Sequence, residues 1–333
     1  MAEAEPLRVM TYNCLYSSVP RPAPWTARRP LVMGLIRDEA PDVAALQEVL
    51  EPQLPEIAAD LPAYRSIAGE SSGRSRGLER IAKLWPFALA AWIVFIVLEC
   101  RLRSRRGRSS PRHSRPARIA SVLVHGAFLV ASIVLPAGLA FLDWYRGPLS
   151  SIGEYCPILY RPEKFRPLES GSFWLSREPE ESGTSFPLMS SPRVAHWVRF
   201  ARNAGGRDLF VLNLHGGHAP WHHAPTAALV LRALDEHARG ADTIVLGDFN
   251  ALPESELHRR LTARLADAWE TARTREGAGE TFYWRSGLSF MPPLRIDFVL
   301  ADRSFAPAVA RVRSGTRDGV FPSDHDAVIV DFD

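Results

Sequence analysis

The stretch Ile244-Val245-Leu246-Gly247-Asp248-Phe249-Asn250 predicts a buried strand that ends in polar side chains. Three apolar residues in succession, two of them β-branched, are typical of a strand inside a sheet. Asp248 and Asn250 follow at alternate positions, so both side chains can face one side of a cleft. A carboxylate and a carboxamide placed there can activate water and hold an oxyanion. Taken alone, an acid and an amide after a strand are more often part of a capped turn.

Several other predicted strands carry polar residues at their ends. The expected strands are 7–13, 43–49, 154–161, 173–175, 195–200, 208–215, 295–300 and 327–332, and a helix is expected over 227–238. The polar residues that they deliver are Asn13, Glu48, Glu154, His215, Asp297, Asp324 and His325.

Each of these residues has a purely structural alternative. A lone histidine after a strand is more often a hydrogen-bonded loop residue than a catalyst. The Glu48 carboxylate needs a partner, which can be a salt bridge or a divalent cation such as Mg²⁺. Together with Asp248 and Asn250, however, these polar strand ends are hard to explain by chance. No serine or cysteine nucleophile motif and no glycine-rich phosphate loop competes with them.

Seven motifs resemble those of the endonuclease/exonuclease/phosphatase superfamily and follow in that family's order. They are Thr11-Tyr12-Asn13, Leu46-Gln47-Glu48, Glu154 with Ile158-Leu159-Tyr160-Arg161, Asn213-Leu214-His215, Gly247-Asp248-Phe249-Asn250, Arg295-Ile296-Asp297 and Ser323-Asp324-His325. The resemblance covers residues 7–72 and 148–333. It implies an α/β fold, a four-layer sandwich of two packed mixed β-sheets flanked by helices, and hydrolysis of a phosphoester.

The resemblance also implies a role for each residue. Mg²⁺ or Mn²⁺ would be held by Glu48, helped by Asn13 and Asp324. The implied catalytic residues are His215, Asp248, Asn250, Asp297, His325 and Glu154, with Asp248 acting on the attacking water and Asn250 holding the phosphate. His325 would pair with Asp297, and His215 with Glu154. In-line attack on a phosphoester needs a Lewis acid, an oriented water and hydrogen-bond donors, which these residue types supply.

Two stretches depart from the family pattern. After His215, where relatives have an aspartate two residues on, this chain has Gly216-Gly217-His218. Late in the chain, where relatives often place a histidine after Thr-Phe, it has Thr281-Phe282-Tyr283. Both differences concern substrate recognition, and they leave the hydrolytic residues in place.

Residues 84–98 and 119–144 are strongly apolar, and residues 101–118 between them contain eight arginines and no acid. This pattern predicts two transmembrane helices joined by a basic loop, inserted between the catalytic parts 1–72 and 148–333. Two buried helices of a globular core are the alternative, although core helices normally keep a polar stripe. The chain is therefore expected to be an integral membrane protein, bound to the membrane through 84–144. The positive-inside rule slightly favours an extracytoplasmic catalytic domain.

The charge distribution limits the choice of substrate. The formal net charge is +3, but the arginine run alone carries +8, so the rest of the chain carries −5. A basic stripe that would follow a nucleic-acid backbone is not evident. A nuclease-like phosphodiesterase is still the first choice. The alternatives are a membrane-anchored phosphatase or phospholipase C-like enzyme acting on lipid headgroups, and a catalytically inactive membrane scaffold. The expected partner is a phosphoester substrate, nucleic acid or lipid headgroup, and no protein partner is predicted.

Overall fold

The computed structural model describes residues 6–16, 23–73, 153–186, 191–285 and 291–333. By its internal contacts the chain divides into one unit formed by Met1–Arg74 and Leu149–Asp333 and another formed by Ser75–Pro148. The fold and the site described below belong to the first unit. The boundaries predicted for the catalytic domain and for an inserted segment stay a prediction.

The first sheet has seven strands in the order β10-β12-β13-β1-β2-β4-β3. Its strands are β1 (Leu7–Asn13), β2 (Val43–Gln47), β3 (Arg65–Ile67), β4 (Ile158–Tyr160), β10 (Thr274–Glu276), β12 (Pro307–Arg313) and β13 (Ala327–Phe332). The central strand β1 pairs in parallel with β2 and antiparallel with β13, so the sheet is mixed.

The second sheet has six strands in the order β5-β6-β7-β8-β11-β9. They are β5 (Phe165–Trp174), β6 (Val194–Arg202), β7 (Leu209–His215), β8 (Asp242–Asp248), β9 (Ala266–Asp267) and β11 (Asp297–Ala301). Strand β8 pairs in parallel with β7 and antiparallel with β11. In this register Asp248 lies opposite both His215 and Asp297. Three of the predicted site residues, His215, Asp248 and Asp297, therefore lie side by side at the ends of neighbouring inner strands.

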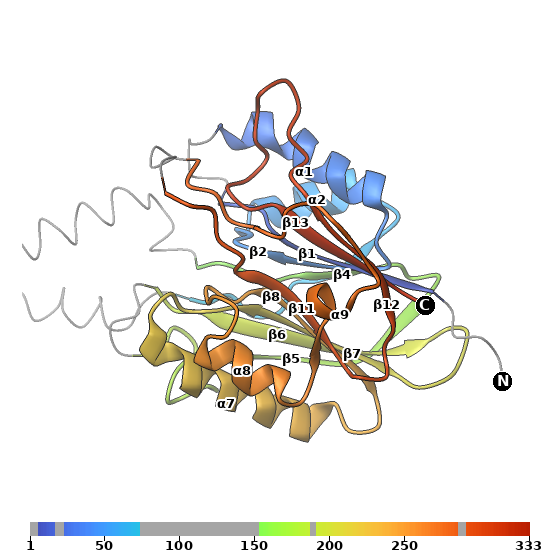
Figure 1. The fold of residues 1–333 in the computed structure, drawn as a ribbon, viewed down its shortest axis with the longest axis vertical. Helices are drawn as coiled ribbons and strands as arrows, with labels where there is room; N and C mark the ends of the chain where they lie inside the picture. Colours follow the sequence, from blue (N-terminus) through green and yellow to red (C-terminus); the bar gives the residue numbers. More distant parts are fainter. Residues whose placement is uncertain (1–5, 17–22, 74–152, 187–190, 286–290) are drawn as a thin grey trace, which may run out of the picture. The chain divides into compact units, whose positions relative to one another are not determined.

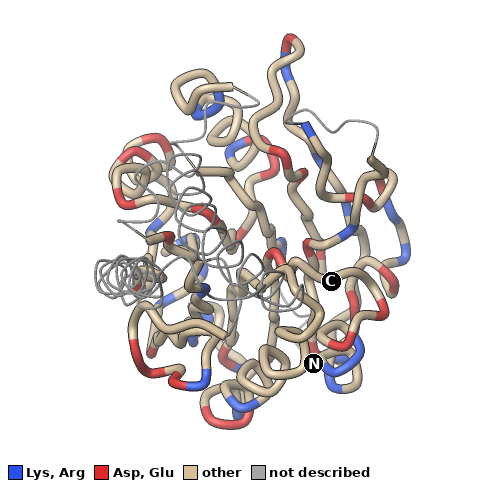
Figure 2. Tube along the Cα trace, turned by 90° about the vertical axis from the view of Figure 1, so that its left-hand side faces the viewer, with Lys and Arg blue, Asp and Glu red and all other residues tan. Residues whose placement is uncertain are grey.

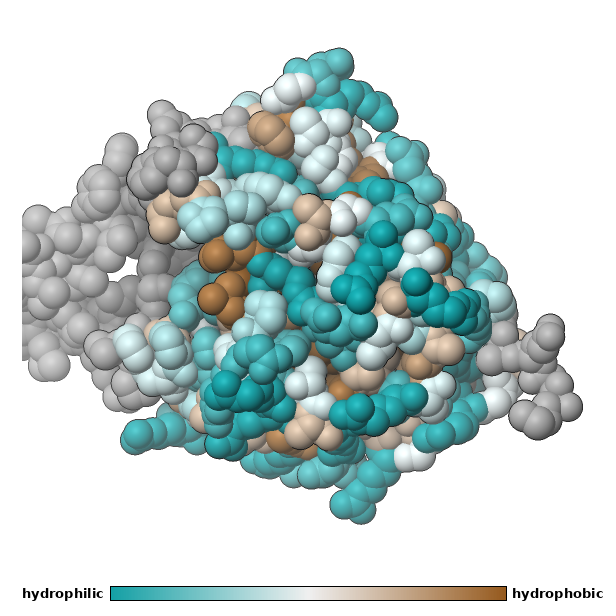
Figure 3. Space-filling model, viewed as in Figure 1, coloured by the Kyte–Doolittle hydropathy of each residue, from teal (hydrophilic) through white to brown (hydrophobic). Residues whose placement is uncertain are grey.

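Helices cover the outer face of each sheet, as Figure 1 shows. They are α1 (Trp25–Glu39), α2 (Gln53–Asp60), α7 (Pro220–His237) and α8 (Glu256–Thr262), whereas the short α9 (Ala268–Thr271) packs into the cluster between the sheets. Apolar side chains alternate along the strands: in β8, Val245 packs toward α7 and α8, while Ile244 and Leu246 pack between the sheets. A third apolar cluster joins α1 and α2 to the first sheet. The result is four layers, and hydrophilic side chains cover most of the face seen in Figure 3.

The predicted architecture of two packed mixed sheets with flanking helices is confirmed. Several element boundaries differ from the prediction. The helix expected over 227–238 begins at Pro220, and the strand expected over 154–161 is reduced to Ile158–Tyr160. The short strand predicted at 173–175 is the end of the ten-residue β5.

The described residues form no helix that is both long enough and apolar enough to cross a membrane. For the part of the chain that the structure describes, the prediction of an integral membrane protein with an extracytoplasmic catalytic domain is therefore wrong. The segments predicted to span the bilayer, 84–98 and 119–144, and the basic loop 101–118 lie outside the described residues.

A buried polar bridge connects the two sheets. Gln47, at the end of β2, donates from Nε2 to Asn213 Oδ1 in β7 at 2.7 Å. Asn213 in turn donates from Nδ2 to the carbonyls of Leu46 and Pro157, at 2.8 and 3.2 Å. Both amide side chains are fully buried. Because buried polar groups are costly without partners, this bridge favours one relative placement of the sheets.

Replacing Asn213 with leucine should therefore destabilise the protein by about 2–4 kcal/mol, because the Gln47 amide and the two carbonyls lose a buried partner. The free energy of unfolding from urea denaturation measures this. Asn203→Leu, at an exposed amide, is the control and should cost less than about 1 kcal/mol. Equal losses in the two variants would show that the bridge contributes nothing specific.

Candidate active site

Asp248 lies at the centre of the predicted site. Its carboxyl group is buried, and its Oδ2 atom lies 3.5 Å from His215 Nε2 and 3.7 Å from His325 Nε2. Asn13 Nδ2 donates to the same oxygen at 3.0 Å, and the backbone N–H of Asn250 donates to Oδ1 at 2.9 Å. Burial raises the pKa of Asp248, but the two imidazoles and these hydrogen bonds outweigh burial and lower it. The group is therefore an ionised carboxylate between two histidines.

Asp297 orients His325 through the ring nitrogen Nδ1, on the side of the ring away from Asp248. His325 Nδ1 lies 2.8 Å from Asp297 Oδ2, and both side chains are buried. Burial lowers the pKa of His325, but the carboxylates of Asp297 and Asp248 outweigh burial and raise it well above its usual value. At neutral pH the ring is then an imidazolium, whose Nε2–H faces Asp248. A positively charged donor in this position can stabilise negative charge that develops on a phosphoryl oxygen.

His215 is held by a second buried carboxylate. Its Nδ1 atom lies 2.9 Å from Glu154 Oε1, and Arg193 Nη1 lies 2.9 Å from the same nitrogen. Arg193 also donates to Glu154 Oε1 at 2.6 Å, and Tyr16 donates its hydroxyl to Oε2 at 2.5 Å. Burial raises the pKa of Glu154, but the charges of Arg193 and His215 outweigh it, so the carboxyl stays ionised. Glu154 and Arg193 favour opposite tautomers of His215, because Glu154 accepts from Nδ1–H and Arg193 donates to a bare Nδ1.

Glu48 is held in a strained position beside this cluster. It follows β2 with a φ of 59°, which is uncommon for a non-glycine residue. Oε1 accepts from Asn13 Nδ2 at 3.1 Å, while Oε2 is buried without a hydrogen-bond partner among the described residues. Burial, helped by the nearby charges of Asp324 and Glu154 and opposed by His215, raises the pKa of Glu48 to about 7. A partly exposed carboxylate whose Oε2 atom is buried and unpaired, close to other carboxylates, fits a divalent cation.

The three predicted metal ligands are placed differently. Glu48 offers a free oxygen. Asn13 directs its amide nitrogen at Glu48 and Asp248, while its oxygen accepts from the backbone N–H of Leu15 at 3.0 Å. Asp324 is half-buried, and its charge acts on Glu48. The ligand set Glu48, Asn13 and Asp324 stays a prediction.

A second group of possible ligand atoms lies beside Glu48. Asp248, Asp297 and His325 each offer one atom within 4.8 Å of the others. Asp297 Oδ1 is also buried without a hydrogen-bond partner among the described residues. His325 cannot ligate a cation while it is an imidazolium, but the carboxylate oxygens of Glu48, Asp248 and Asp297 suit a hard divalent cation such as Mg²⁺ or Mn²⁺.

Asn250 lies next to Asp248 in a left-handed backbone conformation, with a φ of 49°. Its Nδ2 atom donates to the Gly216 carbonyl at 3.2 Å. Gly216 directly follows His215 and begins the Gly216-Gly217-His218 stretch. A Cβ atom there would lie 2.2 Å from the carbonyl oxygen of Phe249, so only glycine fits. This contact explains the glycine at 216 and not the absence of an aspartate at 217, and the role of Asn250 in holding a phosphate stays a prediction.

Sequence reasoning missed Arg193 and Tyr16. Arg193 directly precedes β6, which runs antiparallel to β7, so its side chain enters at the edge where His215 ends its strand. The sequence signal for Arg193 is its position between Pro192 and the apolar strand predicted over 195–200. Tyr16 lies three residues beyond the end of β1 and carries no such signal.

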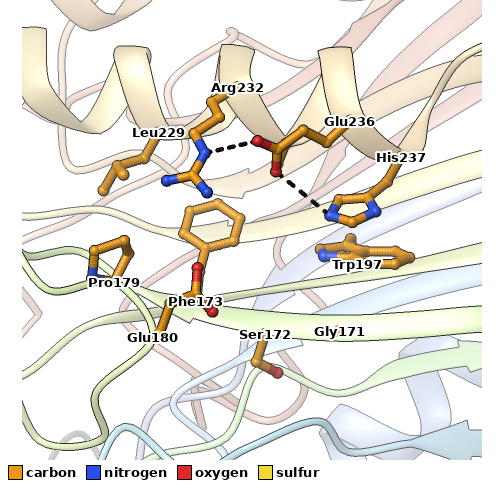
Figure 4. A pocket seen from close by; sticks show the side chains of 11 residues that line it. Gly171, Ser172, Phe173, Pro179, Glu180, Trp197, Leu229, Arg232, Glu236 and His237 are labelled. Carbon is orange, nitrogen blue, oxygen red and sulfur yellow. Dashed lines mark hydrogen bonds and ion pairs between the residues drawn. The ribbon is translucent and has the colours of Figure 1, made fainter.

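A surface hollow of about 230 Å³ lies elsewhere, between α7 and strands β5 and β6 (Figure 4). Phe173 and Trp197 form its floor, and His237 stacks on Trp197 with ring centroids 4.2 Å apart. Arg232 and Glu236 pair at its rim. None of the predicted site residues lines it. The catalytic assignment therefore rests on the strand ends and not on this hollow.

Comparison with known structures places the fold. A protein of the endonuclease/exonuclease/phosphatase group from Bacteroides vulgatus is 20% identical, with a TM-score of 0.71 and 99% of each chain covered. A mannosyl-6-phosphatase from Bacteroides thetaiotaomicron is 22% identical, with a TM-score of 0.67, over 98% of this chain and 99% of that one. TDP2 from D. rerio, complexed with a single-strand DNA product, is 14% identical, with a TM-score of 0.60, over 99% of this chain and 100% of that one.

No curated protein matches the sequence. The model of the Endonuclease/Exonuclease/phosphatase family matches residues 10–325, which is nearly the whole chain. These boundaries enclose every predicted site residue, from Asn13 to His325. The chain therefore belongs to the endonuclease/exonuclease/phosphatase family, whose members are phosphoester hydrolases.

Proposed function

We propose that the protein is a metal-dependent phosphodiesterase. One observation carries this proposal: the ionised carboxylate of Asp248 is buried between two histidines, each backed by its own carboxylate, beside a Glu48 oxygen that has no partner. This arrangement supplies a group to orient water and two groups to contact a phosphoryl centre. A purely structural cluster has no need for an unpaired buried carboxylate oxygen.

The residues divide the chemistry between them. Asp248 orients the attacking water and accepts its proton as the water oxygen bonds to phosphorus and the ester P–O bond breaks. The imidazolium of His325 donates to a phosphoryl oxygen, and Asp297 keeps that ring charged and oriented. His215 faces the same centre, held by Glu154. A divalent cation held by Glu48 would act as a Lewis acid on the phosphoryl group.

Charge and the family comparisons bear on the substrate. Basic and acidic residues are interspersed along the described part of the chain in Figure 2, which gives no continuous basic track for a long nucleic acid. A small diester or a short nucleic-acid end fits this surface better. A phosphomonoesterase is the second candidate. This candidate is supported by the fold, which is shared with a mannosyl-6-phosphatase.

Hydrolysis should require a divalent cation and should depend on Asp248 and His325. Asp248→Asn and His325→Gln keep the side-chain size but remove the proton acceptor and the charged donor. Each should lower kcat for bis-nitrophenyl phosphate by at least about 100-fold, in Mg²⁺ or Mn²⁺. His237→Ala, in the separate hollow, is the control and should keep the wild-type rate. The ratio of rates on bis-nitrophenyl and mononitrophenyl phosphate decides between diester and monoester.

Full activity in EDTA would contradict the metal dependence. A folded wild-type protein that hydrolyses neither ester with either cation would contradict the proposed activity as a whole.

The raised pKa of Glu48 predicts a pH-dependent stability. Because the folded protein binds this proton more tightly than the unfolded chain, the contribution of Glu48 to stability falls as pH rises from its usual pKa of 4.5 to about 7. In EDTA at about pH 8, Glu48→Gln should therefore melt at a higher temperature than the wild type. Near pH 4.5 the two should melt alike.

Calorimetry with added Mn²⁺ completes the measurement. At about pH 8 the cation should raise the melting temperature of the wild type and leave Glu48→Gln nearly unchanged. Glu51→Gln, at an exposed position, controls for the loss of a charge. If Glu48→Gln is less stable than the wild type in EDTA at about pH 8, the ionised Glu48 carboxylate does not destabilise the folded protein, and the prediction is wrong.

A further inference from the structure

Arg28 is a buried cation that the proposed chemistry does not use. It lies on α1, is fully buried, and has the largest side chain among the fully buried residues that the structure describes. Within the described ranges, no carboxylate lies within ion-pairing distance of it. Its guanidinium group donates instead to five backbone carbonyls, those of Cys14, Leu15, Tyr16, Ala23 and Pro322, at 2.7–3.3 Å.

Three of these carbonyls belong to the loop after β1. Nη1 contacts Cys14 and Leu15, and Nη2 contacts Leu15 and Tyr16. To turn three successive carbonyls toward one group, Leu15 adopts a φ of 55°, which is unfavourable for a leucine. The same turn brings the Leu15 N–H to Asn13 Oδ1 at 3.0 Å. This contact directs the amide nitrogen of Asn13 toward Glu48 and Asp248.

The fourth contact reaches the other side of the site. Arg28 Nη1 donates to the Pro322 carbonyl at 2.9 Å, 294 residues away in sequence. The next residue, Ser323, donates its hydroxyl to the Asn13 carbonyl at 2.7 Å and accepts from the backbone N–H of His325 at 3.1 Å. Arg28 and Ser323 thus join the loop that orients Asn13 to the loop that carries Asp324 and His325.

We propose that Arg28 is a positioning residue that clamps these two loops, so that Glu48, held by the Asn13 amide, and Asp324 meet in the geometry that binds the divalent cation. The proposal rests on the proposed metal-dependent function. A guanidinium group is suited to this task because it offers five donors in a rigid planar fork, whereas a lysine ammonium offers three from one point. The positive charge also lies close enough to Asp324 and Glu48 to interact with both.

A direct metal-binding measurement separates positioning from simple stabilisation. Arg28→Lys keeps the charge but cannot reach all five carbonyls, and Arg28→Gln removes the charge. Electron paramagnetic resonance counts free Mn²⁺ in titrations about 15 °C below the lowest melting temperature, where every variant is folded. Both variants should raise the Kd for Mn²⁺ by about 10- to 100-fold, the usual effect of losing a group that orients metal ligands.

Arg29→Ala is the matched control. Arg29 is the next residue on α1 and pairs with Asp60 and Glu56 at the surface. Its loss should lower the melting temperature without changing the Kd for Mn²⁺. Ser323→Ala tests the clamp independently, and its effect on the Kd should be less than additive with that of Arg28→Lys, because both hold the same pair of loops.

The proposal is overturned if Arg28→Lys melts at a lower temperature but binds Mn²⁺ with the wild-type Kd, because the clamp is then structural only. If the arginine variants do not fold, the same result with Ser323→Ala overturns it. Tight Mn²⁺ binding by a wild-type protein that hydrolyses no ester would count against the proposed function and not against the clamp.

Discussion

The arrangement of this fold depends on the contacts that the buried carboxylate of Asp248 makes with Asn13, His215 and His325. An ionised group that is 1% exposed needs partners, and they come from separate parts of the chain. Asn13 ends β1 of the first sheet, His215 ends β7 of the second, and His325 precedes β13. Each is within 4 Å of the same oxygen. The charge can be accommodated only when both sheets are packed with these strand ends together.

The surrounding polar interactions make that packing specific. The side chains of the strand bodies are apolar and similar in kind, since Val, Leu and Ala occur in each of the three large apolar clusters. The amide pair Gln47 and Asn213 fixes how the sheets face each other, and Arg28 fixes how two loops meet at the sheet edge. In each case a buried donor has its partner only in one arrangement. Stability and active-site geometry therefore share the same hydrogen bonds.

The apolar core strands were predictable from sequence because their apolar runs are long and their ends are polar. Strands 7–13 and 327–332 were placed with the boundaries that the structure has. The strand over 154–161 was predicted too long, because Glu154 pairs with Arg193 and Tyr16 instead of continuing the sheet. Strands β3, β9 and β10 have two or three residues each, too few for a periodic pattern to show.

The site was predictable as a set of residues and not as a geometry. The positions of Asp248, His215 and Asp297 at strand ends can be predicted from the sequence. The positive φ of Glu48 and the orientation of Asn13 cannot, because they depend on tertiary contacts. Arg193 lies far in sequence from both groups it holds. The apolar segments 84–98 and 119–144, with the basic loop 101–118 between them, predict membrane helices, and all three lie outside the described residues. No helix of the described fold supports that assignment.

Anomalous diffraction from crystals grown with Mn²⁺ and a phosphorothioate diester tests the central claim most directly. The account predicts a manganese peak beside Glu48 Oε2 and a sulfur peak between Asp248 and the Nε2 atoms of His215 and His325. Glu48→Gln crystals should lose the manganese peak. A manganese ion bound only elsewhere, or a phosphorothioate group away from Asp248 in protein that turns over the same ester in solution, would contradict the account.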